Sequence, residues 1–329
     1  MMIDQTKRRP LLPLAAVVAI VLWALLSANA LRGAWAGKEG FLAFNRSRAD
    51  VVVDSDRIQQ GIDSLKQATG FNPGSDSSWR ALGYLLLEQG DEDEALAAWR
   101  NAEGMAAELF NKGTRAKAGG EHDQALDWFK LTVALAPQMV NGWLEAGFIH
   151  EQRGDLHSAA AAFTTGLEAT PDNSDLAYQL GRIHMAMDQP ADWHTVLAWA
   201  DRAIAQGNFL HEWSRHQSHY LRGEALRNLG REREALVEYI QVTKGLPTFY
   251  WGLVRRAELS WIVEADAAAA EQYYLAAIDL NPGSKWAYRH YARDLAAMGR
   301  LDDARLYFER VLSLDPGDQV AADWLRQNP

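Results

Sequence analysis

Apolar and small residues recur along most of this chain with a period of about 34 residues. Each period contains a first stretch with a large residue at position 4, a small residue at position 8 and an apolar residue at position 11. A second stretch has alanine at position 20 and an aromatic residue at position 24, and proline follows at position 32. Spacings of three and four residues are typical of amphipathic helices, so the pattern predicts a repeated pair of helices.

The prolines mark this period most clearly. Successive gaps of 34, 76, 35 and 34 residues separate five of them, and 76 equals two periods of 34 plus eight inserted residues: Pro137, Pro171, Pro247, Pro282 and Pro316. A helix pair of this size buries its apolar face only by stacking on neighbouring pairs. We therefore expect an all-α fold, a right-handed superhelical solenoid of antiparallel helix pairs.

Packing explains why these residue types recur. In the unit that begins at Asn141, small Gly147 and Ala159 allow two helices to approach, while bulky Trp143 and Phe163 fill the space between pairs. This combination resembles the tetratricopeptide repeat, with its pattern of Trp, Leu-Gly and Tyr followed by Ala, Phe and Pro. The resemblance covers residues 76–318 and implies seven repeats of that family.

Two further segments extend the array. Residues 42–75 fit a degenerate repeat whose second helix is in register through Leu65, Ala68 and Pro73. Residues 319–329 read as a capping helix, which a solenoid needs to cover its last apolar face. Extra residues between Gln189 and Gln217 lengthen the loops around one amphipathic helix.

The N-terminal region predicts a membrane segment. Residues 11–26 carry no polar side chain, and the apolar stretch extends to Leu31, long enough to span a bilayer as a helix. We interpret residues 1–10 as a cytoplasmic tail, 11–31 as a transmembrane helix or signal anchor and 32–41 as a linker. Lys7, Arg8 and Arg9 favour repeats outside the cytoplasm, at the inner membrane. A cleaved signal peptide ending near Ala30 is the alternative.

Composition narrows the chemistry. The net charge is −10 and makes nucleic acid a poor partner, and the absence of cysteine excludes disulfides and thiolate sites. No phosphate-binding loop, nucleophile motif or zinc-protease motif occurs. His211, His216 and His219 lack the companions of a metal site. We therefore expect no enzyme activity, no metal and no cofactor.

The resemblance also implies where a partner binds. In that family the first helices line a concave groove through positions 2, 5, 9 and 12, and several of these positions are aromatic or basic here. The candidate groove residues are Arg80, Tyr84, Phe148, Tyr178, Arg182, Tyr220, Arg227, Arg255, Arg289 and Arg293. A local excess of arginine favours an extended or acidic protein segment. Alternatively, these arginines pair with carboxylates of adjacent helices.

Three functions fit these features. The first is a membrane-anchored scaffold or assembly factor that holds partner proteins in the groove. The second is an accessory protein of a glycan or polysaccharide assembly machinery, with an acidic or sugar ligand. The third is a regulatory subunit that faces the cytoplasm.

Overall fold

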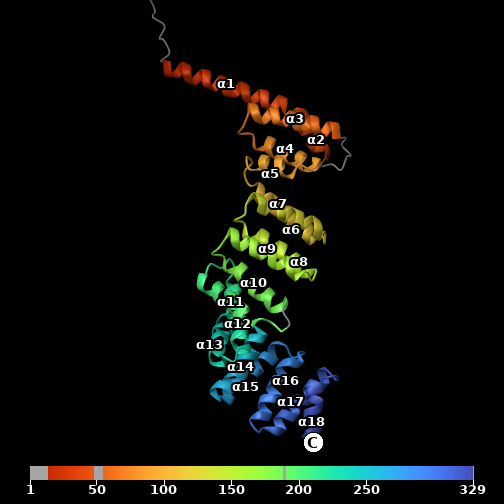
Figure 1. Cartoon of the computed structure of the whole chain (residues 1–329), viewed down its shortest axis with the longest axis vertical. Helices are drawn as coiled ribbons and strands as arrows, with labels where there is room; N and C mark the ends of the chain where they lie inside the picture. Colours follow the sequence, from red (N-terminus) through yellow and green to blue (C-terminus); the bar gives the residue numbers. More distant parts are fainter. Residues whose placement is uncertain (1–13, 48–54, 188–189, 329) are drawn as a thin grey trace, which may run out of the picture. The chain divides into compact units, whose positions relative to one another are not determined.

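The structure, a computed structural model, describes residues 14–47, 55–187 and 190–328. Eighteen helices follow one another in these residues, and the same residues contain no strand. Figure 1 shows the order of these helices along the chain. The chain divides into two compact units, Met1–Ala136 (unit 1) and Pro137–Pro329 (unit 2). The prediction of an all-helical array of stacked pairs is confirmed, and the right-handed superhelix stays a prediction.

Unit 1 contains one long helix and three helix pairs, α2 with α3, α4 with α5, and α6 with α7. Its helices are α1 (Leu14–Ala36), α2 (Lys38–Ser47), α3 (Ser55–Phe71), α4 (Asp76–Gln89), α5 (Glu92–Trp99), α6 (Met105–Ala118) and α7 (His122–Leu135). A core centred on Leu65, Leu85 and Trp99 joins the first two pairs and receives apolar residues of α7.

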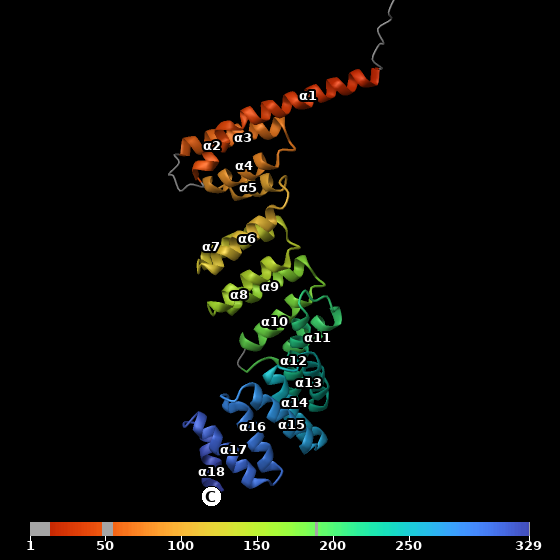
Figure 2. The same cartoon turned by 180° about the vertical axis from the view of Figure 1, so that it is seen from behind.

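Unit 2 contains five helix pairs and a final single helix. They are α8 (Val140–Gln152) with α9 (Leu156–Ala169), α10 (Ser174–Met187) with α11 (Trp193–Gln206), α12 (Glu212–Asn228) with α13 (Glu232–Gly245), α14 (Tyr250–Glu264) with α15 (Ala267–Leu280), and α16 (Lys285–Ala297) with α17 (Leu301–Leu314). The last helix, α18 (Gln319–Gln327), packs on α17. Its Trp324 stacks on Phe308 with ring centroids 4.7 Å apart. The paired helices of each unit lie side by side in both views (Figure 2).

Position 8 and position 24 meet inside several pairs, as the repeat pattern predicted. A Cβ atom at Gly147 would lie closer than 3.0 Å to the ring of Phe163, and one at Gly83 would clash with Trp99 in the same way. Glycine is therefore the residue that lets an aromatic ring of the second helix enter the first. Each repeat proline lies two residues beyond the end of a second helix, for example Pro171 after Ala169.

The first helix pair begins earlier than the sequence indicated. Residues 32–41, which we interpreted as a linker, are helical, because α1 continues to Ala36 and α2 begins at Lys38. Three glycines explain the close packing of this stretch on α3. Gly33 lies against Ala68 and Asn72, Gly37 against Ala68, and Gly40 against Leu65.

Helix α1 carries most of the predicted membrane segment. Its first part extends past the end of α3 in both views (Figures 1 and 2). Residues 11–13 of that segment lie outside the described residues. Within the part of the chain that the structure describes, no helix is both long and apolar enough to cross a bilayer.

Candidate partner-binding face

The ten candidate groove residues divide between the two units. Arg80 and Tyr84 lie on α4 in unit 1, and the other eight lie on α8, α10, α12, α14 and α16 in unit 2. We call the surface formed by these five helices the first-helix face of unit 2. The candidate residues thus form two groups.

In unit 1, Arg80 and Tyr84 are held by carboxylates. Arg80 Nε donates to Asp76 Oδ2 over 2.5 Å, and its Nη1 donates to Glu108 on α6. The Tyr84 hydroxyl donates to Glu108 Oε1 over 2.5 Å. The hydrogen bond from Arg80 lowers the pKa of Asp76 below its usual value. These two residues join successive first helices.

Arg182 plays the same part between α8 and α10. Its Nη2 donates to Glu151 Oε2 over 2.6 Å, its Nη1 to Glu151 Oε1, and its Nε to Gln179 over 2.8 Å. Burial opposes the charge on Arg182, but Glu151 more than offsets this effect, so the net pKa of Arg182 is raised. The same hydrogen bonds lower the pKa of Glu151. The pair is a bidentate clamp between repeats.

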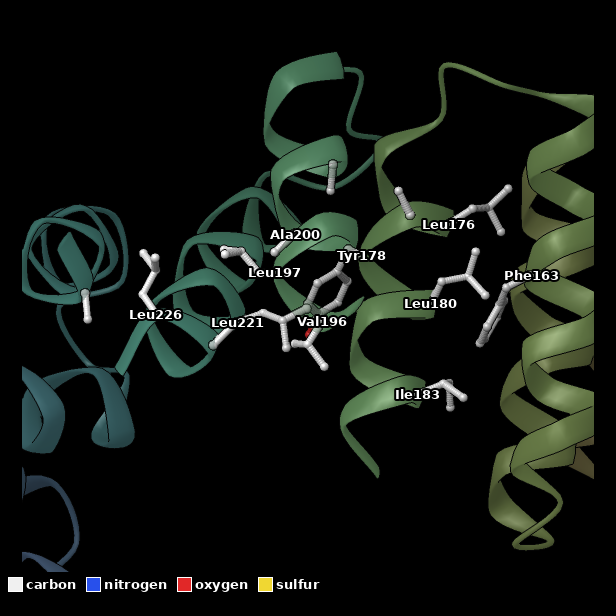
Figure 3. Close-up of a cluster of buried hydrophobic side chains, with 14 of the residues drawn as sticks. Phe163, Leu176, Tyr178, Leu180, Ile183, Val196, Leu197, Ala200, Leu221 and Leu226 are labelled. Atoms are coloured by element: carbon white, nitrogen blue, oxygen red, sulfur yellow. The ribbon is translucent and has the colours of Figure 1, made fainter. Parts of the chain in front are cut away.

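Tyr178 is a core residue and not a surface contact. Only 5% of it is exposed, and it lies among the apolar side chains of α10, α11 and α12 (Figure 3). Trp213, near the start of α12, packs edge-on against it at a centroid distance of 6.1 Å. Burial raises the pKa of Tyr178 to about 12. Phe148 is half-buried against Phe163.

Glu224 on α12 contacts several candidate residues of the central repeats. Its Oε1 accepts from Arg255 Nε over 2.8 Å and from the Tyr239 hydroxyl over 2.7 Å, and Arg227 lies 3.5 Å from its Oε2. Arg255 Nη1 also donates to Glu258 over 3.0 Å. Glu224 and Glu258 together therefore balance the charges of Arg227 and Arg255. Tyr220 packs edge-on against Phe249 at 5.0 Å.

Two tryptophans and several cations alternate at the end of the face. The ring centroids of Trp251 on α14 and Trp286 on α16 are 6.2 Å apart. The Arg255 guanidinium lies 5.8 Å from Trp251, and that of Arg289 lies 4.3 Å from Trp286. Trp286 remains 38% exposed. Cations over indole faces hold both rings in place and leave an amphipathic surface.

Arg293 differs from the other candidate arginines. Arg289 lies 3.3 Å from Asp318, a carboxylate that Lys285 also contacts at 3.0 Å. Arg293 is exposed, and no hydrogen bond or ion pair to it is found among the described residues. Lys285, Arg289 and Arg293 follow one another at intervals of four, so they share one side of α16. One cation of this stripe is thus uncompensated.

Two titratable groups lie beneath that stripe. Burial lowers the pKa of His290 to about 4, opposed by Glu258 and reinforced by Arg255, Arg293 and Arg289. Burial raises the pKa of Asp294 to about 6, opposed by its hydrogen bond from Tyr274 and by Arg293. At neutral pH the imidazole is therefore uncharged and the carboxylate is charged.

Sequence reasoning missed the carboxylates that define this face. Glu108, Glu151 and Glu224 lie on first helices and Asp318 precedes the last helix, and each binds an arginine one repeat away. These carboxylates lie at different positions of their repeats, so the repeat pattern does not reveal them. Trp251 and Trp286 were visible as tryptophans that no core position explained. Within the described ranges no cluster of side chains could hold a metal ion.

Family models match two segments of the chain. Both describe the tetratricopeptide repeat, over residues 46–108 and 295–318. These two segments carry tetratricopeptide repeats. A curated relative, cellulose synthase operon protein C of Pseudomonas fluorescens strain SBW25, is 28% identical over 141 residues. That match covers 39% of this chain and only 11% of the relative.

Solved structures of similar fold include two pilus proteins. PilF of Pseudomonas aeruginosa has a TM-score of 0.57 at 12% identity and covers 68% of this chain and 97% of its own. PilW, a type IV pilus biogenesis factor, has a TM-score of 0.54 at 14% identity, with 68% and 100% covered. A chain of the APC/C hetero-tetramer Cut9–Hcn1 has a TM-score of 0.53 at 13% identity, with 83% of this chain and 53% of that chain covered. At such identities the likeness shows the fold alone.

Proposed function

We propose that this chain is a non-catalytic scaffold that holds a protein partner on the first-helix face of unit 2. The observation that carries the proposal is the stripe Lys285, Arg289 and Arg293 beside the exposed ring of Trp286. A chain of net charge −10 repels acidic partners in general, so a local cationic stripe selects where one docks. The partner segment is extended, with carboxylates for the cations and an apolar side chain for the indole.

Pairing inside the protein limits which arginines take part. Arg182 and Arg255 are bound by carboxylates and are largely buried, so they serve as supports between repeats. Arg293 remains as the principal free contact, and Arg289 keeps donors beyond its 3.3 Å contact with Asp318. The binding site is therefore smaller than the row of ten residues that the sequence predicted.

Attachment to the cytoplasmic membrane through residues 11–31 is part of the proposal, with the repeats on the extracytoplasmic side. Large apolar side chains of α1 support it, because Leu22, Leu25 and Leu26 are each more than half exposed. Exposed leucines at helical spacing along one side of a helix are stabilised by a lipid environment. The basic residues Lys7, Arg8 and Arg9 precede this stretch. Repeats that face the cytoplasm as a regulatory subunit are the reverse arrangement.

A role in glycan assembly is the second candidate. The similarity to a protein named for a cellulose synthase operon favours it, as does the exposed indole of Trp286. Arg289 and Lys285 lie 4.3 Å and 5.1 Å from the centroid of that ring, so a sugar would have to stack on the part of the indole that stays exposed. A charged protein segment uses both the ring and the cations, so we place the protein partner first.

Partner capture tests this site. Immobilised full-length chain is incubated with solubilised envelope extract of the source organism, and captured proteins are quantified at two salt concentrations. Arg293→Glu is expected to reduce capture of the specific partner about tenfold, because it places a repulsive charge in the contact. Arg233→Glu on α13 is the matched control, since Arg233 is also exposed and has no ion pair among the described residues. Equal capture by both variants would exclude this face, and capture of a soluble polysaccharide in place of protein would favour the second candidate.

A further inference from the structure

The stacking of helix pairs changes between α5 and α6. Several second helices pack closely on the following first helix, as α3 does on α4, α9 on α10 and α11 on α12. Helix α5 has only 8 residues, against 14 in α7, and in unit 1 it touches α7 in place of a close contact with α6. Leu131 and Trp128 of α7 join the core formed by α4 and α5. The pair α6–α7 thus presents its second helix to the preceding repeat.

A cleft opens where this unusual contact is made. Its walls come from the end of α4, the start of α5 and the middle of α7, and its volume is ≈ 370 Å³. Leu87, Trp128 and Leu131 supply the apolar part, and Glu92, Gln124, Asp127 and Lys130 supply the polar part. Pockets of roughly 300–1,000 Å³ bind small molecules or the side chains of a peptide.

Lys112 fixes the tryptophan that forms one wall. Its Nζ lies 4.6 Å from the ring centroid of Trp128 and 4.6 Å from that of Tyr84. The ammonium group therefore covers one face of the indole, and the half-buried Trp128 also lines the cleft. A ring held in this way is a preformed apolar contact.

The charge at the cleft is negative. Lys130, its one cationic lining residue, is bound by Glu92, with Nζ 2.9 Å from Oε1 and 3.0 Å from Oε2. Asp127 is exposed and has no ion pair or hydrogen bond among the described residues. Glu92 and Asp93 also begin α5. An apolar floor with an uncompensated carboxylate at its rim suits a cation joined to an apolar group.

We propose that this cleft, which we call the α5–α7 cleft, binds a partner segment with a large aliphatic side chain next to arginine or lysine. The aliphatic group contacts Leu87, Trp128 and Leu131, and the cation pairs with Asp127. This surface is separate from the first-helix face of unit 2, and it selects the opposite charge. The chain then holds two different segments, an acidic one in unit 2 and a basic apolar one in unit 1.

The absence of cysteine from the chain allows a site-specific test. Gln124→Cys places a single thiol at the rim of the cleft in the full chain, and Thr165→Cys on the exposed surface of α9 is the control. Each thiol is equilibrated with a disulfide-bearing hexapeptide, Ser-Arg-Leu-Leu-Arg-Ser, under graded reductant, and conjugates are counted by intact mass. We expect the Gln124→Cys chain to retain this probe at about tenfold more reductant than the control, since a tenfold preference is ~1.4 kcal/mol.

Variant probes and variant chains separate the two parts of the recognition. A probe with glutamates in place of arginines, or serines in place of leucines, is expected to lose the preference. Asp127→Lys changes an exposed residue without a partner, so the fold is kept, and it is expected to abolish the preference for the basic probe. Equal retention at both thiols would overturn the proposal. It would also be overturned if sedimentation showed that the chain dimerises and Asp127→Lys abolished the dimer, because a second copy would then fill the cleft.

Discussion

Position 15 of the repeat ends the first helix in a left-handed conformation. Glycine occupies it in most repeats, as at Gly154 with φ +76° and Gly230 with φ +73°. In the α14–α15 pair the residue is Ala265, with φ +53° and a backbone N–H that donates to the carbonyls of Ser260 and Trp261. A Cβ atom in this region costs about 1–2 kcal/mol. The repeat therefore carries local strain that its neighbours avoid.

Ala265→Gly is expected to raise the free energy of unfolding of unit 2 by about 1 kcal/mol, because glycine adopts this conformation without strain. Gly154→Ala, at the same position of another repeat, is the reciprocal control and is expected to lower it by a similar amount. Thermal melting followed by circular dichroism measures both. A lower melting temperature for Ala265→Gly would contradict this account.

His290 and Asp294 predict a pH dependence with opposing signs. The pKa of His290 is about 4 in the fold, below its usual 6.5, so acidification from pH 6.5 to 4 favours the unfolded chain, which takes up the proton. The pKa of Asp294 is about 6, above its usual 3.8, so the folded chain takes up the proton over a similar range. Acidification is thus destabilising through one group and stabilising through the other.

Single variants should separate the contributions of His290 and Asp294 to the pH dependence of stability. His290→Gln is expected to gain stability relative to the native chain as the pH falls from 6.5 to 4, and Asp294→Asn is expected to lose it. Each relative change is on the order of 2–3 kcal/mol, since one pKa unit corresponds to ~1.4 kcal/mol. Melting temperatures across this range provide the measurement, and parallel curves for the native chain and both variants would rule out the assigned ionisation states.

Between elements, carboxylate–arginine contacts join one first helix to the next. Glu108, Glu151 and Glu224 each bind an arginine of a neighbouring repeat. Such contacts add directional links to a stack that is otherwise apolar. Most arginines of the first-helix face of unit 2 are therefore paired within the protein and are not available to a partner.

Arg255 and Arg293 should therefore behave differently when truncated. Arg255→Ala leaves Glu258 buried without its arginine, and Glu224 keeps only the longer 3.5 Å contact with Arg227, so a loss of about 3–5 kcal/mol in unfolding free energy is expected. Arg293→Ala removes an exposed group that has no ion pair among the described residues, so its effect should stay within about 0.5 kcal/mol. Denaturant titration distinguishes the two, and similar losses would show that Arg293 also supports the fold.

The pattern of single residue types predicted the helix pairs but not the electrostatics between them. Gly147 and Phe163 could be matched from sequence because their contact lies within one repeat and recurs in others. The partner of Arg255 could not, because Glu224 lies on another helix and the contact depends on how the repeats stack. Tyr178 occupies a predicted surface position, yet Trp213 from the lengthened region after α11 covers it. Insertions change burial without changing the repeat pattern.

At the scale of the whole molecule, the two units offer different chemistry. Unit 2 presents Arg293 and Trp286 on its first helices, and unit 1 presents Asp127 and Trp128 beside a cleft. A scaffold that selects segments of opposite charge can hold two partners without competition between them. Attachment to a membrane would then concentrate both partners near one surface.

The proposed anchor makes the final prediction. Full-length protein expressed in a bacterial host should remain with the membranes after carbonate extraction, whereas a chain that begins at Lys38 should be released. The prediction rests on the sequence, because the mostly apolar stretch of residues 11–31 has roughly the 20-residue length of a spanning helix, whereas no helix of the described residues is both long and apolar enough to cross a bilayer. Mass determination should find residues 1–10 still attached. Protease added to spheroplasts should digest the repeats, because the basic tail is expected to stay in the cytoplasm. A mature N-terminus near Leu31 would show a cleaved signal peptide and contradict the anchor, and repeats that resist protease until the cells are lysed would place them on the cytoplasmic side.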